Sequence, residues 1–136
     1  MKAAAPFRLR APVVPEDDLH LSVRDCLSIA IAAPGVASND GVMWFTVEMR
    51  NARDAIEGAK RKRKGVVAGV PDIWVFYRGT VLAIELKRRG GARSKAQRDL
   101  HAQLNACGVP VMVCRSVEEV LACLRRRYIP MRRLAL

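Results

Sequence analysis

Long apolar runs are absent from this 136-residue sequence, which contains no stretch of 18 apolar residues and so no segment typical of a membrane-spanning helix. The N-terminal MKAAAPFRLR also lacks the apolar core of a secretory signal, and we interpret it as a short basic arm. Cysteine is limited to four residues without a C-x-x-C pair, a spacing that excludes the common zinc sites. We expect four free thiols in a cytoplasmic protein that has no membrane partner.

Aromatic and acidic residues are also scarce. Aromatics make up 5% of the chain and leave no evident stacking platform for single-stranded nucleic acid, since Trp44, Phe45, Trp74 and Phe76 are expected in the core. Asp and Glu number 13 against 24 Lys and Arg, which gives a formal net charge of +11. Such an excess is typical of a protein that binds a polyanion, because contacts to phosphates release counterions.

The basic residues are concentrated in three blocks, Arg50–Lys64, Lys87–Arg98 and Arg125–Arg133, which together carry a net charge of +16 and leave −5 for the remainder. One such block is commonly a solvated helix face. Three blocks around one carboxylate-bearing segment favour nucleic acid as the partner. We expect the phosphate backbone to be held by the basic side chains nearest that segment: Arg61, Lys62, Arg63, Lys64, Arg88, Arg89, Arg93 and Lys95.

A length of 136 residues and a hydrophobic fraction of 51% allow one buried core. We therefore predict a single domain over residues 1–136. Its core covers about residues 16–127, with a basic N-terminal arm at 1–15 and a basic C-terminal tail at 128–136.

The patterning predicts an α/β fold in which a mixed β-sheet is flanked by helices on both faces. A helix follows Pro15 and stops at Pro34-Gly35, and capping boxes at Ser94 and Ser116 begin two further helices, the second with Tyr128 on its apolar face. Asn51–Lys64 fits either a helix or an ordered basic loop. Strands are expected at Val42–Glu48, Ile73–Tyr77, Thr80–Leu86 and Val109–Cys114.

A two-residue hairpin loop at Arg78-Gly79 would pair Ile73 with Ile84 and place Asp72 opposite Glu85. A type I turn with a bulge at Gly79 would instead shift this register by one residue. Opposed carboxylates repel each other, so the pair needs a counter-charge. Lys87 alone is one candidate, and a divalent cation bound by carboxylate and carbonyl oxygens is the other.

A cation at Asp72 and Glu85 with Lys87 beside it is the minimal equipment for hydrolysing a phosphodiester. The alternative is structural: a surface salt bridge between Glu85 and Lys87, with Asp72 as a turn residue. The proline before Asp72, the hairpin register and the basic flanks together favour the catalytic interpretation.

The segment GVPDIWVFYRGTVLAIELKRRGG resembles the PD-(D/E)-x-K nuclease signature, and GVPDI, IELK and the S-K-A-Q before a helix are most similar to its VRR-NUC branch. The resemblance implies a restriction-endonuclease-like core and Mg²⁺- or Mn²⁺-dependent cleavage of DNA, often at branched sites. Asp72, Glu85 and Lys87 match the catalytic positions, and Leu86 would offer its carbonyl to the metal.

Glu16 and Gln97 match two further positions of the family. Glu16 corresponds to an early helical glutamate, a role that Asp17 or Asp18 could take instead, and helix-dipole compensation explains these acids equally well. His20 stands where the family often has a glutamine, and as a lone histidine on an amphipathic helix it is expected to serve packing or solvation. Gln97 is equally the last member of a capping box.

The sequence thus predicts a metal-dependent DNA endonuclease that recognises shape and phosphate rather than base sequence. A chain this small would most simply cut two strands as a symmetric homodimer. A non-catalytic basic nucleic-acid-binding protein and an RNA-directed nuclease on the same site are the alternatives. His101 lies beside Leu100 and is expected to face solvent.

Overall fold

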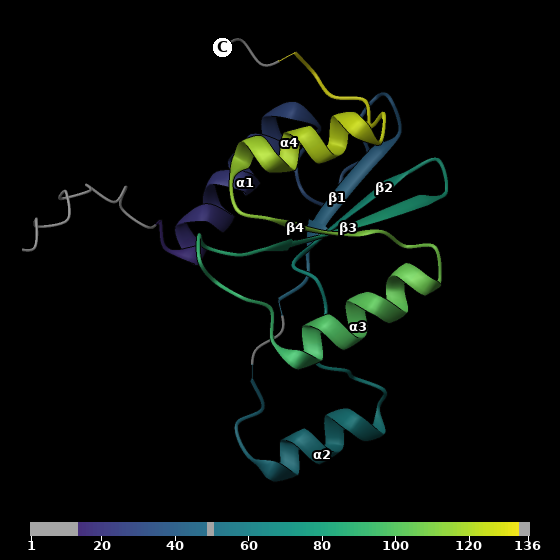
Figure 1. The fold of residues 1–136 in the computed structure, drawn as a ribbon. Helices are drawn as coiled ribbons and strands as arrows, with labels where there is room; N and C mark the ends of the chain where they lie inside the picture. The colour runs from purple at the N-terminus through teal and green to yellow at the C-terminus, as the bar shows by residue number, and fades with distance from the viewer. Residues whose placement is uncertain (1–13, 49–50, 134–136) are drawn as a thin grey trace, which may run out of the picture.

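The computed structural model describes residues 14–48 and 51–133, so residues 1–13 of the predicted arm and 134–136 of the predicted tail lie outside the described residues. The element order follows the predicted one, with a helix in the basic segment (Figure 1). The elements are α1 (Glu16–Ala30), β1 (Val42–Thr46), α2 (Ala55–Arg63), β2 (Ile73–Tyr77), β3 (Thr80–Leu86), α3 (Lys95–Ala106), β4 (Val111–Cys114) and α4 (Val117–Arg126).

The four strands form one mixed sheet in the order β1-β2-β3-β4, with β1, β2 and β3 antiparallel and β4 parallel to β3. The loop between β2 and β3 has two residues, Arg78 and Gly79, with φ of 46° and 76°. Two positive φ values are the signature of a type I′ turn, whose twist matches that of the flanking strands. Ile73 therefore pairs with Ile84, as predicted, and the bulged alternative is excluded.

Helices cover both faces of the sheet, with α1 and α4 on one side and α3 on the other (Figure 1). The main core lies between the sheet and the α1–α4 layer. It contains Leu19, Val23 and Leu27 of α1, Val120 and Leu124 of α4, and alternate strand residues that include Trp44, Ile73, Val75, Ile84 and Leu86. These buried strand positions alternate as a two-residue period requires. The sheet residues between them therefore point toward α3.

The second face is covered unevenly, which corrects part of the predicted core. Trp44 is fully buried and its indole N–H donates to the Ala32 carbonyl. Phe45, Trp74 and Phe76 are half-buried, because α3 packs near β4 and leaves the β1–β2 half of this face without a helix. The rings of Phe45 and Phe76 contact each other there at 5.3 Å between centroids.

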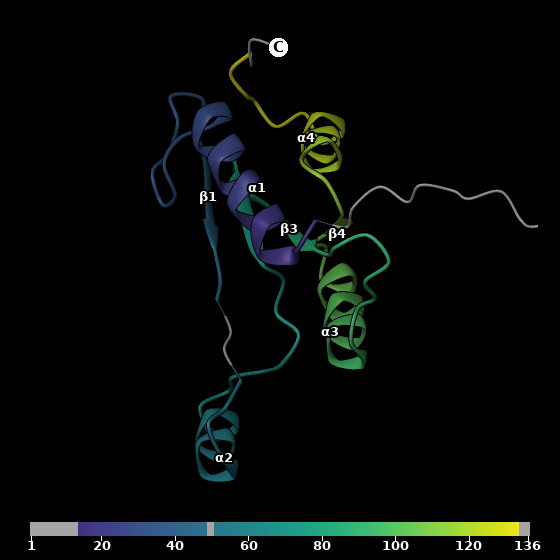
Figure 2. The same ribbon diagram turned by 90° about the vertical axis from the view of Figure 1, so that its left-hand side faces the viewer.

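The helix α2 stands apart from the sheet and the other helices, as two perpendicular views agree (Figures 1 and 2). None of its nine residues is buried. Its start is fixed locally, since the Asp54 carboxylate accepts from the Glu57 N–H at 2.8 Å and Glu57 also pairs with Arg61 at 3.0 Å. Local capping and charge pairs therefore stabilise this helix in place of core packing.

Several predicted boundaries differ from the observed ones. The strand predicted at Val42–Glu48 ends at Thr46, although the Val47 N–H still donates to the Asp72 carbonyl at 2.8 Å. The strand predicted from Val109 begins at Val111, because Pro110 has no N–H to donate to the ladder.

The last helix differs from its prediction at both ends. At its start the cap is half-formed: Ser116 accepts from the Glu119 N–H, but the Glu119 side chain accepts from Arg115. At its end the chain leaves α4 before Tyr128, which has a φ of 57° and is 87% exposed. Ile129 occupies the buried position instead.

The four cysteines are free, as predicted, and Cys114 and Cys123 are buried with their sulfur atoms 3.6 Å apart. Within residues 14–48 and 51–133, no helix combines the length and the apolar character needed to cross a membrane.

Candidate active site

Four structural elements meet at the end of the sheet where β2 begins and β3 ends. The N-terminus of α1 arrives there from one face and the N-terminus of α3 from the other. Asp72 directly precedes β2 and Glu85 is the penultimate residue of β3, so the observed register brings these carboxylates to the same end of the hairpin. The Leu86 N–H donates to Asp72 Oδ2 at 2.8 Å, which fixes the aspartate against β3.

Glu85 is a buried carboxylate, with 1% of its surface exposed. Its Oε1 accepts from Gln97 Nε2 at 2.7 Å and lies 3.7 Å from Lys87 Nζ. Burial, followed by the charge of Asp72, raises the pKa of Glu85 to about 7, against the opposing effect of Lys87. Lys87 therefore neutralises the carboxylates of Asp72 and Glu85 only in part. This agrees with the expectation that the pair needs a counter-charge.

Burial also raises the pKa of Asp72, although the hydrogen bond from Leu86 and the charge of His20 act in the opposite direction. His20 lies one turn after Glu16 on α1, and its Nε2 is 3.2 Å from Thr46 Oγ1 on β1. The histidine at the position expected for a glutamine is thus anchored to the sheet beside the carboxylates.

Lys87 lies between two acidic residues at this edge. Its Nζ is 3.7 Å from Glu85 Oε1 and 3.9 Å from Glu16 Oε1, and 12% of its side chain is exposed. Glu16 belongs to the first turn of α1, where it also complements the helix dipole. The structure therefore brings Glu16 to the cluster, while Asp17 lines the adjoining cavity.

Gln97 performs both of the roles that the sequence left open. Its Oε1 accepts from the Ser94 N–H at 2.9 Å and the Ser94 hydroxyl accepts from the Gln97 N–H at 3.1 Å, which completes the capping box. Its Nε2 is left free to donate to Glu85. The cap thereby fixes which end of the amide faces the carboxylate.

Two open cavities meet at Asp72. One, of about 590 Å³, lies between the start of α1 and the end of β1 and includes Glu16, His20, Asp72 and Leu86 in its lining. The other, of about 270 Å³, lies between the 68–72 segment and the start of α3, and includes Asp72 and Gln97. A ligand in either cavity would reach the Asp72 carboxylate.

The donor set fits a divalent cation of the magnesium type. Asp72 Oδ1 makes no hydrogen bond with the described residues, and Glu85 Oε2 is buried without a hydrogen-bond partner. The described residues contain no group of three His, Cys, Asp or Glu side chains that could hold an ion by themselves, so a cation here would need further ligands besides the two carboxylates. Two carboxylates with a strand carbonyl suit Mg²⁺, which keeps several waters and is completed by substrate phosphates.

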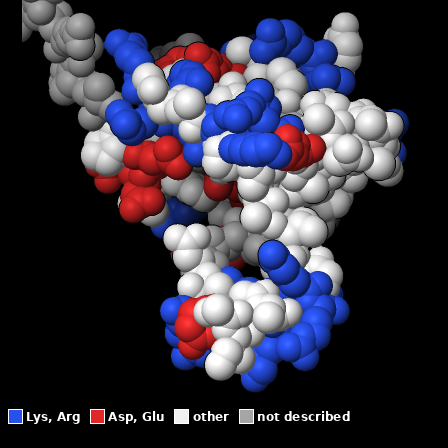
Figure 3. All heavy atoms as spheres, turned by 60° about the horizontal axis from the view of Figure 1, so that its bottom comes forward, with Lys and Arg blue, Asp and Glu red and all other residues white. Residues whose placement is uncertain are grey.

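The basic residues predicted to hold nucleic acid divide by position. Lys62, Arg63 and Lys64 are exposed at the end of α2, and Figure 3 shows basic side chains around α2, with a hollow between it and the main body. Arg88 and Arg89 are exposed directly after Lys87. The Arg115 guanidinium donates to the Arg88 and Gly91 carbonyls at 2.9 and 2.6 Å and so holds this turn.

Three of the predicted basic residues, Arg61, Lys95 and Arg93, contact acidic or buried side chains. Arg61 pairs with Glu57 at 3.0 Å, and Lys95 pairs with Asp99 at 2.7 Å. The half-buried Arg93 turns its NH1 toward His101 Nδ1, at 3.2 Å.

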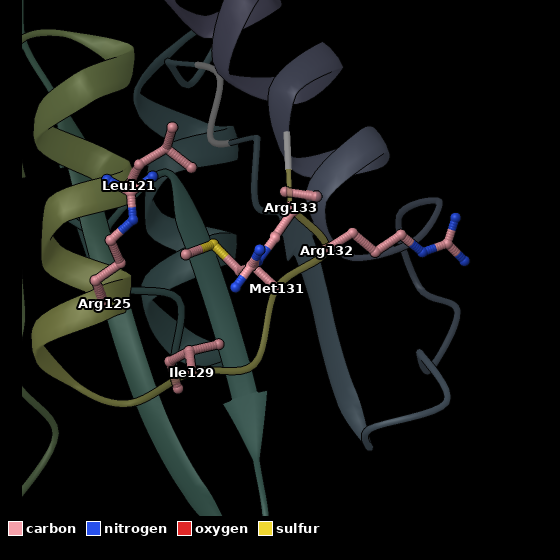
Figure 4. Close-up of a pocket in the computed structure, with 7 residues that line it drawn as sticks. Leu121, Arg125, Ile129, Met131, Arg132 and Arg133 are labelled. Atoms are coloured by element: carbon pink, nitrogen blue, oxygen red, sulfur yellow. The ribbon is translucent and has the colours of Figure 1, made fainter. Parts of the chain in front are cut away.

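The third basic block does not flank the carboxylates. Arg125, Arg132 and Arg133 line a separate cavity of about 350 Å³ with Ala30, at the far end of α1 from Glu16 (Figure 4). Fifteen helical residues separate these two ends by about 22 Å at 1.5 Å per residue. The interpretation that all three blocks surround the acidic pair therefore needs this correction.

One residue of the cluster was not predicted from the sequence. His101, expected in solvent, is 1% exposed, and its Nε2 lies 3.7 Å from Glu85 Oε2. It follows Gln97 by four residues, so both occupy one face of α3. In the sequence His101 is only the neighbour of the apolar Leu100, whereas α3 presents Gln97 and His101 as a polar pair to Glu85 near the end of β3.

Comparisons with known proteins agree with this geometry. No curated protein matches the sequence. A solved structure, described as a VRR_NUC domain protein, superposes with a TM-score of 0.60 at 20% identity, covering 87% of this chain and 89% of its own. That likeness shows that the two chains share a fold. The family model of the VRR-NUC domain matches residues 38–118, a segment that contains Asp72, Glu85, Lys87 and Gln97. The chain therefore belongs to the VRR-NUC family of nucleases.

Proposed function

We propose that this protein is a Mg²⁺- or Mn²⁺-dependent DNA endonuclease selective for branched structures. The observation that carries the proposal is the convergence of Asp72 and Glu85, with Lys87 3.7 Å from Glu85 Oε1, at the open end of the sheet. Asp72, Glu85 and the Leu86 carbonyl would hold the cation. When bound, the ion would polarise a phosphoryl oxygen and lower the pKa of a water molecule.

The side chains around the acidic pair prepare the site for phosphate chemistry. Lys87 is directed toward the carboxylates by Glu85 and Glu16 and can donate to a phosphoryl oxygen or orient the attacking water. Gln97 holds Glu85 Oε1 from the α3 side. Leu86 uses its N–H to fix Asp72, so one strand residue would serve both the aspartate and the cation.

The basic side chains near the site would hold the DNA backbone. The candidates are Lys62, Arg63 and Lys64 at the end of α2, Arg88 and Arg89 after β3, and Arg61, Arg93 and Lys95. Phosphate contacts position a duplex without reading its bases, so we expect selectivity to come from the shape of the DNA.

A homodimer would supply the two active sites that cutting both strands requires. Sedimentation of the protein alone would test this, since a dimer of the 15.1 kDa chain sediments at about 30 kDa. In a dimer, mixing wild-type with inactive Asp72→Asn subunits should convert double-strand cuts into single-strand nicks. A purely 15 kDa species that still cuts both strands together would contradict the dimer.

Cleavage assays on Holliday junctions, flaps, linear duplexes and RNA, with Mg²⁺, Mn²⁺ or EDTA, test the proposed activity. We expect metal-dependent cleavage that is fastest on branched DNA. Asp72→Asn, Glu85→Gln and Lys87→Ala should each lower the rate about 100-fold or more. The matched control is Asp40→Asn, which changes an exposed acid before β1, at the end of the sheet opposite to Asp72.

Three outcomes would contradict the proposal. Tight binding of DNA without cleavage under every condition would indicate a non-catalytic binding protein. Cleavage confined to RNA would indicate an RNA-directed nuclease. Full activity of Asp72→Asn and Glu85→Gln in EDTA would show that the site lies elsewhere.

A further inference from the structure

Two buried polar atoms face each other behind the proposed active site. Glu85 Oε2 and His101 Nε2 are 3.7 Å apart, and neither has a hydrogen-bond partner within the described residues. Both side chains are 1% exposed. An unpaired buried polar atom is costly, so two such atoms directed at each other point to a shared role.

The contact from Arg93 favours a proton on His101 Nε2, whereas the Gly69 carbonyl also accepts from this ring. A guanidinium only donates hydrogen bonds, so in its contact with Arg93 NH1, at 3.2 Å, His101 Nδ1 is the acceptor. In the neutral ring the proton then resides on Nε2, which faces Glu85 Oε2.

Each oxygen of the Glu85 carboxylate consequently has its own neighbour on α3. Gln97 Nε2 donates to Oε1 at 2.7 Å, and His101 directs its Nε2–H toward Oε2 from the next turn of the helix. The hydrogen bond from Gln97 to one oxygen and the His101 ring beside the other restrict rotation of the carboxylate about its last bond. The carboxylate is thus oriented from one side, while the opposite side faces Asp72 and Lys87.

We propose that His101 is a positioning residue for Glu85, held in the required tautomer by Arg93, and that this arrangement sets the affinity of the site for its divalent cation. The second half of the proposal rests on the proposed function. Groups that orient a ligand of a metal commonly change its affinity by 10- to 100-fold when they are removed.

The tautomer can be tested without metal or DNA. Long-range ¹H–¹⁵N spectra of the uniformly labelled full chain in EDTA should show a protonated Nε2 and an unprotonated Nδ1 for His101. In Arg93→Gln the strength of this preference should fall, since the donor to Nδ1 is weakened. An Nδ1–H tautomer in the wild type would overturn the proposal, whether or not the protein is a nuclease.

Calorimetric titration with Mn²⁺ tests the effect on the site. The amide nitrogen of glutamine is the same number of bonds from Cα as His101 Nε2, so glutamine can offer its N–H at the same place. The affinity of His101→Gln for Mn²⁺ should therefore stay within about 3-fold of wild type. Asparagine reaches only the Nδ1 position and leucine offers no donor, so His101→Asn and His101→Leu should bind about 10-fold more weakly or worse. Their kcat should fall while KM for DNA is unchanged.

Thermal unfolding in EDTA checks that each variant is folded. If His101→Leu does not fold, Arg93→Met is the deciding variant. Arg93 is half-buried, and this change removes the donor to Nδ1 without altering the buried ring. It should weaken Mn²⁺ binding. Unchanged Mn²⁺ affinity in folded His101→Leu, or in Arg93→Met, would overturn the proposal. If the wild type binds no Mn²⁺, the metal-dependent function is refuted. The spectra that assign the His101 tautomer then test the positioning of Glu85 by themselves.

Discussion

At the scale of single residues, the acidic pair is built around an unfavourable charge arrangement. Glu85 is removed from water and placed near Asp72, and Lys87 offsets the repulsion only in part, at 3.7 Å from Glu85 Oε1. Gln97 contributes a neutral donor instead of a second charge. A site that is incompletely neutralised by its own side chains is suited to bind an external cation.

The raised pKa of Glu85 gives the metal-free protein a distinctive pH dependence. Between pH 4.5 and about 7 the folded protein keeps the Glu85 proton while the unfolded chain has lost it, so stability falls as pH rises through this window. The loss should be on the order of 2 to 3 kcal/mol, from about 1.4 kcal/mol per pKa unit. Chemical denaturation in EDTA from pH 5 to pH 8 would measure it.

Glu85→Gln is the control for this experiment, because it keeps the side-chain shape without the titrating group. His101 acts with the opposite sign: its lowered pKa makes stability rise with pH below about 6.5. The difference between wild type and Glu85→Gln isolates the carboxylate. Equal pH profiles for the two proteins would show that Glu85 has an ordinary pKa in the folded state.

At the scale of elements, the site depends on how closely α3 approaches the segment before β2. Gly69 has a φ of 89°, and a Cβ there would lie 2.5 Å from the Ala96 carbonyl oxygen and 2.7 Å from the Gln97 nitrogen. Only glycine fits both the backbone conformation and the contact. The start of α3, and with it Gln97, is thereby seated against the sheet end.

Gly69→Ala should therefore damage both stability and site geometry. Gly35→Ala is a matched control, since Gly35 has a φ of 76° but no atom within 4 Å of the added methyl group. The control should lose about 1 to 2 kcal/mol of unfolding free energy from the positive φ alone. Gly69→Ala should lose more, and in addition cleave DNA more slowly. Equal losses and equal activity would show that the approach of α3 to Gly69 is unimportant.

The elements themselves follow closely from local sequence signals. The hairpin from Ile73 to Leu86 is observed with the predicted bounds because a two-residue loop permits one register. The Ser94 cap likewise places the start of α3. Predictions failed where packing decides, as at Tyr128, where a left-handed residue ends the helical pattern and Ile129 is buried instead.

At the scale of the whole molecule, the charge is divided between two ends. The basic residues of α2 and of the segment after β3 belong to the parts of the chain that lead into and out of the hairpin of the carboxylates, and Arg125, Arg132 and Arg133 line a cavity at the other end of α1 (Figure 4). Since screening in physiological salt limits charge interactions to about 8 Å, the two groups act separately. A net charge of +11 is therefore not one continuous surface.

Neutralising each group separately should distinguish their roles. We expect weaker binding to all DNA sequences alike when Lys62, Arg63 and Lys64 are changed together to Gln. The plot of log binding constant against log salt concentration should become flatter by about 0.9 in slope for each lost phosphate contact. Stability should be unchanged, because α2 has no buried residue. Fluorescence anisotropy across 50 to 300 mM salt would measure the slopes.

The matched control changes Arg125, Arg132 and Arg133 to Gln and removes the same charge from the opposite end. We expect its effect on the slope to be much smaller. A larger effect from this control than from the α2 variant would place the DNA path along the other end of the molecule. Loss of affinity for some sequences but not others in the α2 variant would indicate base recognition instead.

The sequence by itself determined the family, the mixed sheet and the acidic pair, because a PD motif, an E-x-K strand and a tight hairpin are local patterns whose geometry follows from residue spacing. The tertiary structure alone decided that His101 is buried against Glu85, that Gln97 serves the cap and the carboxylate at once, and that one basic block lies away from the site. The first two features depend on the packing of α3 against the end of the sheet, and the third on where the C-terminal segment packs along α1. Packing between segments distant in the chain leaves no periodic signal in the sequence.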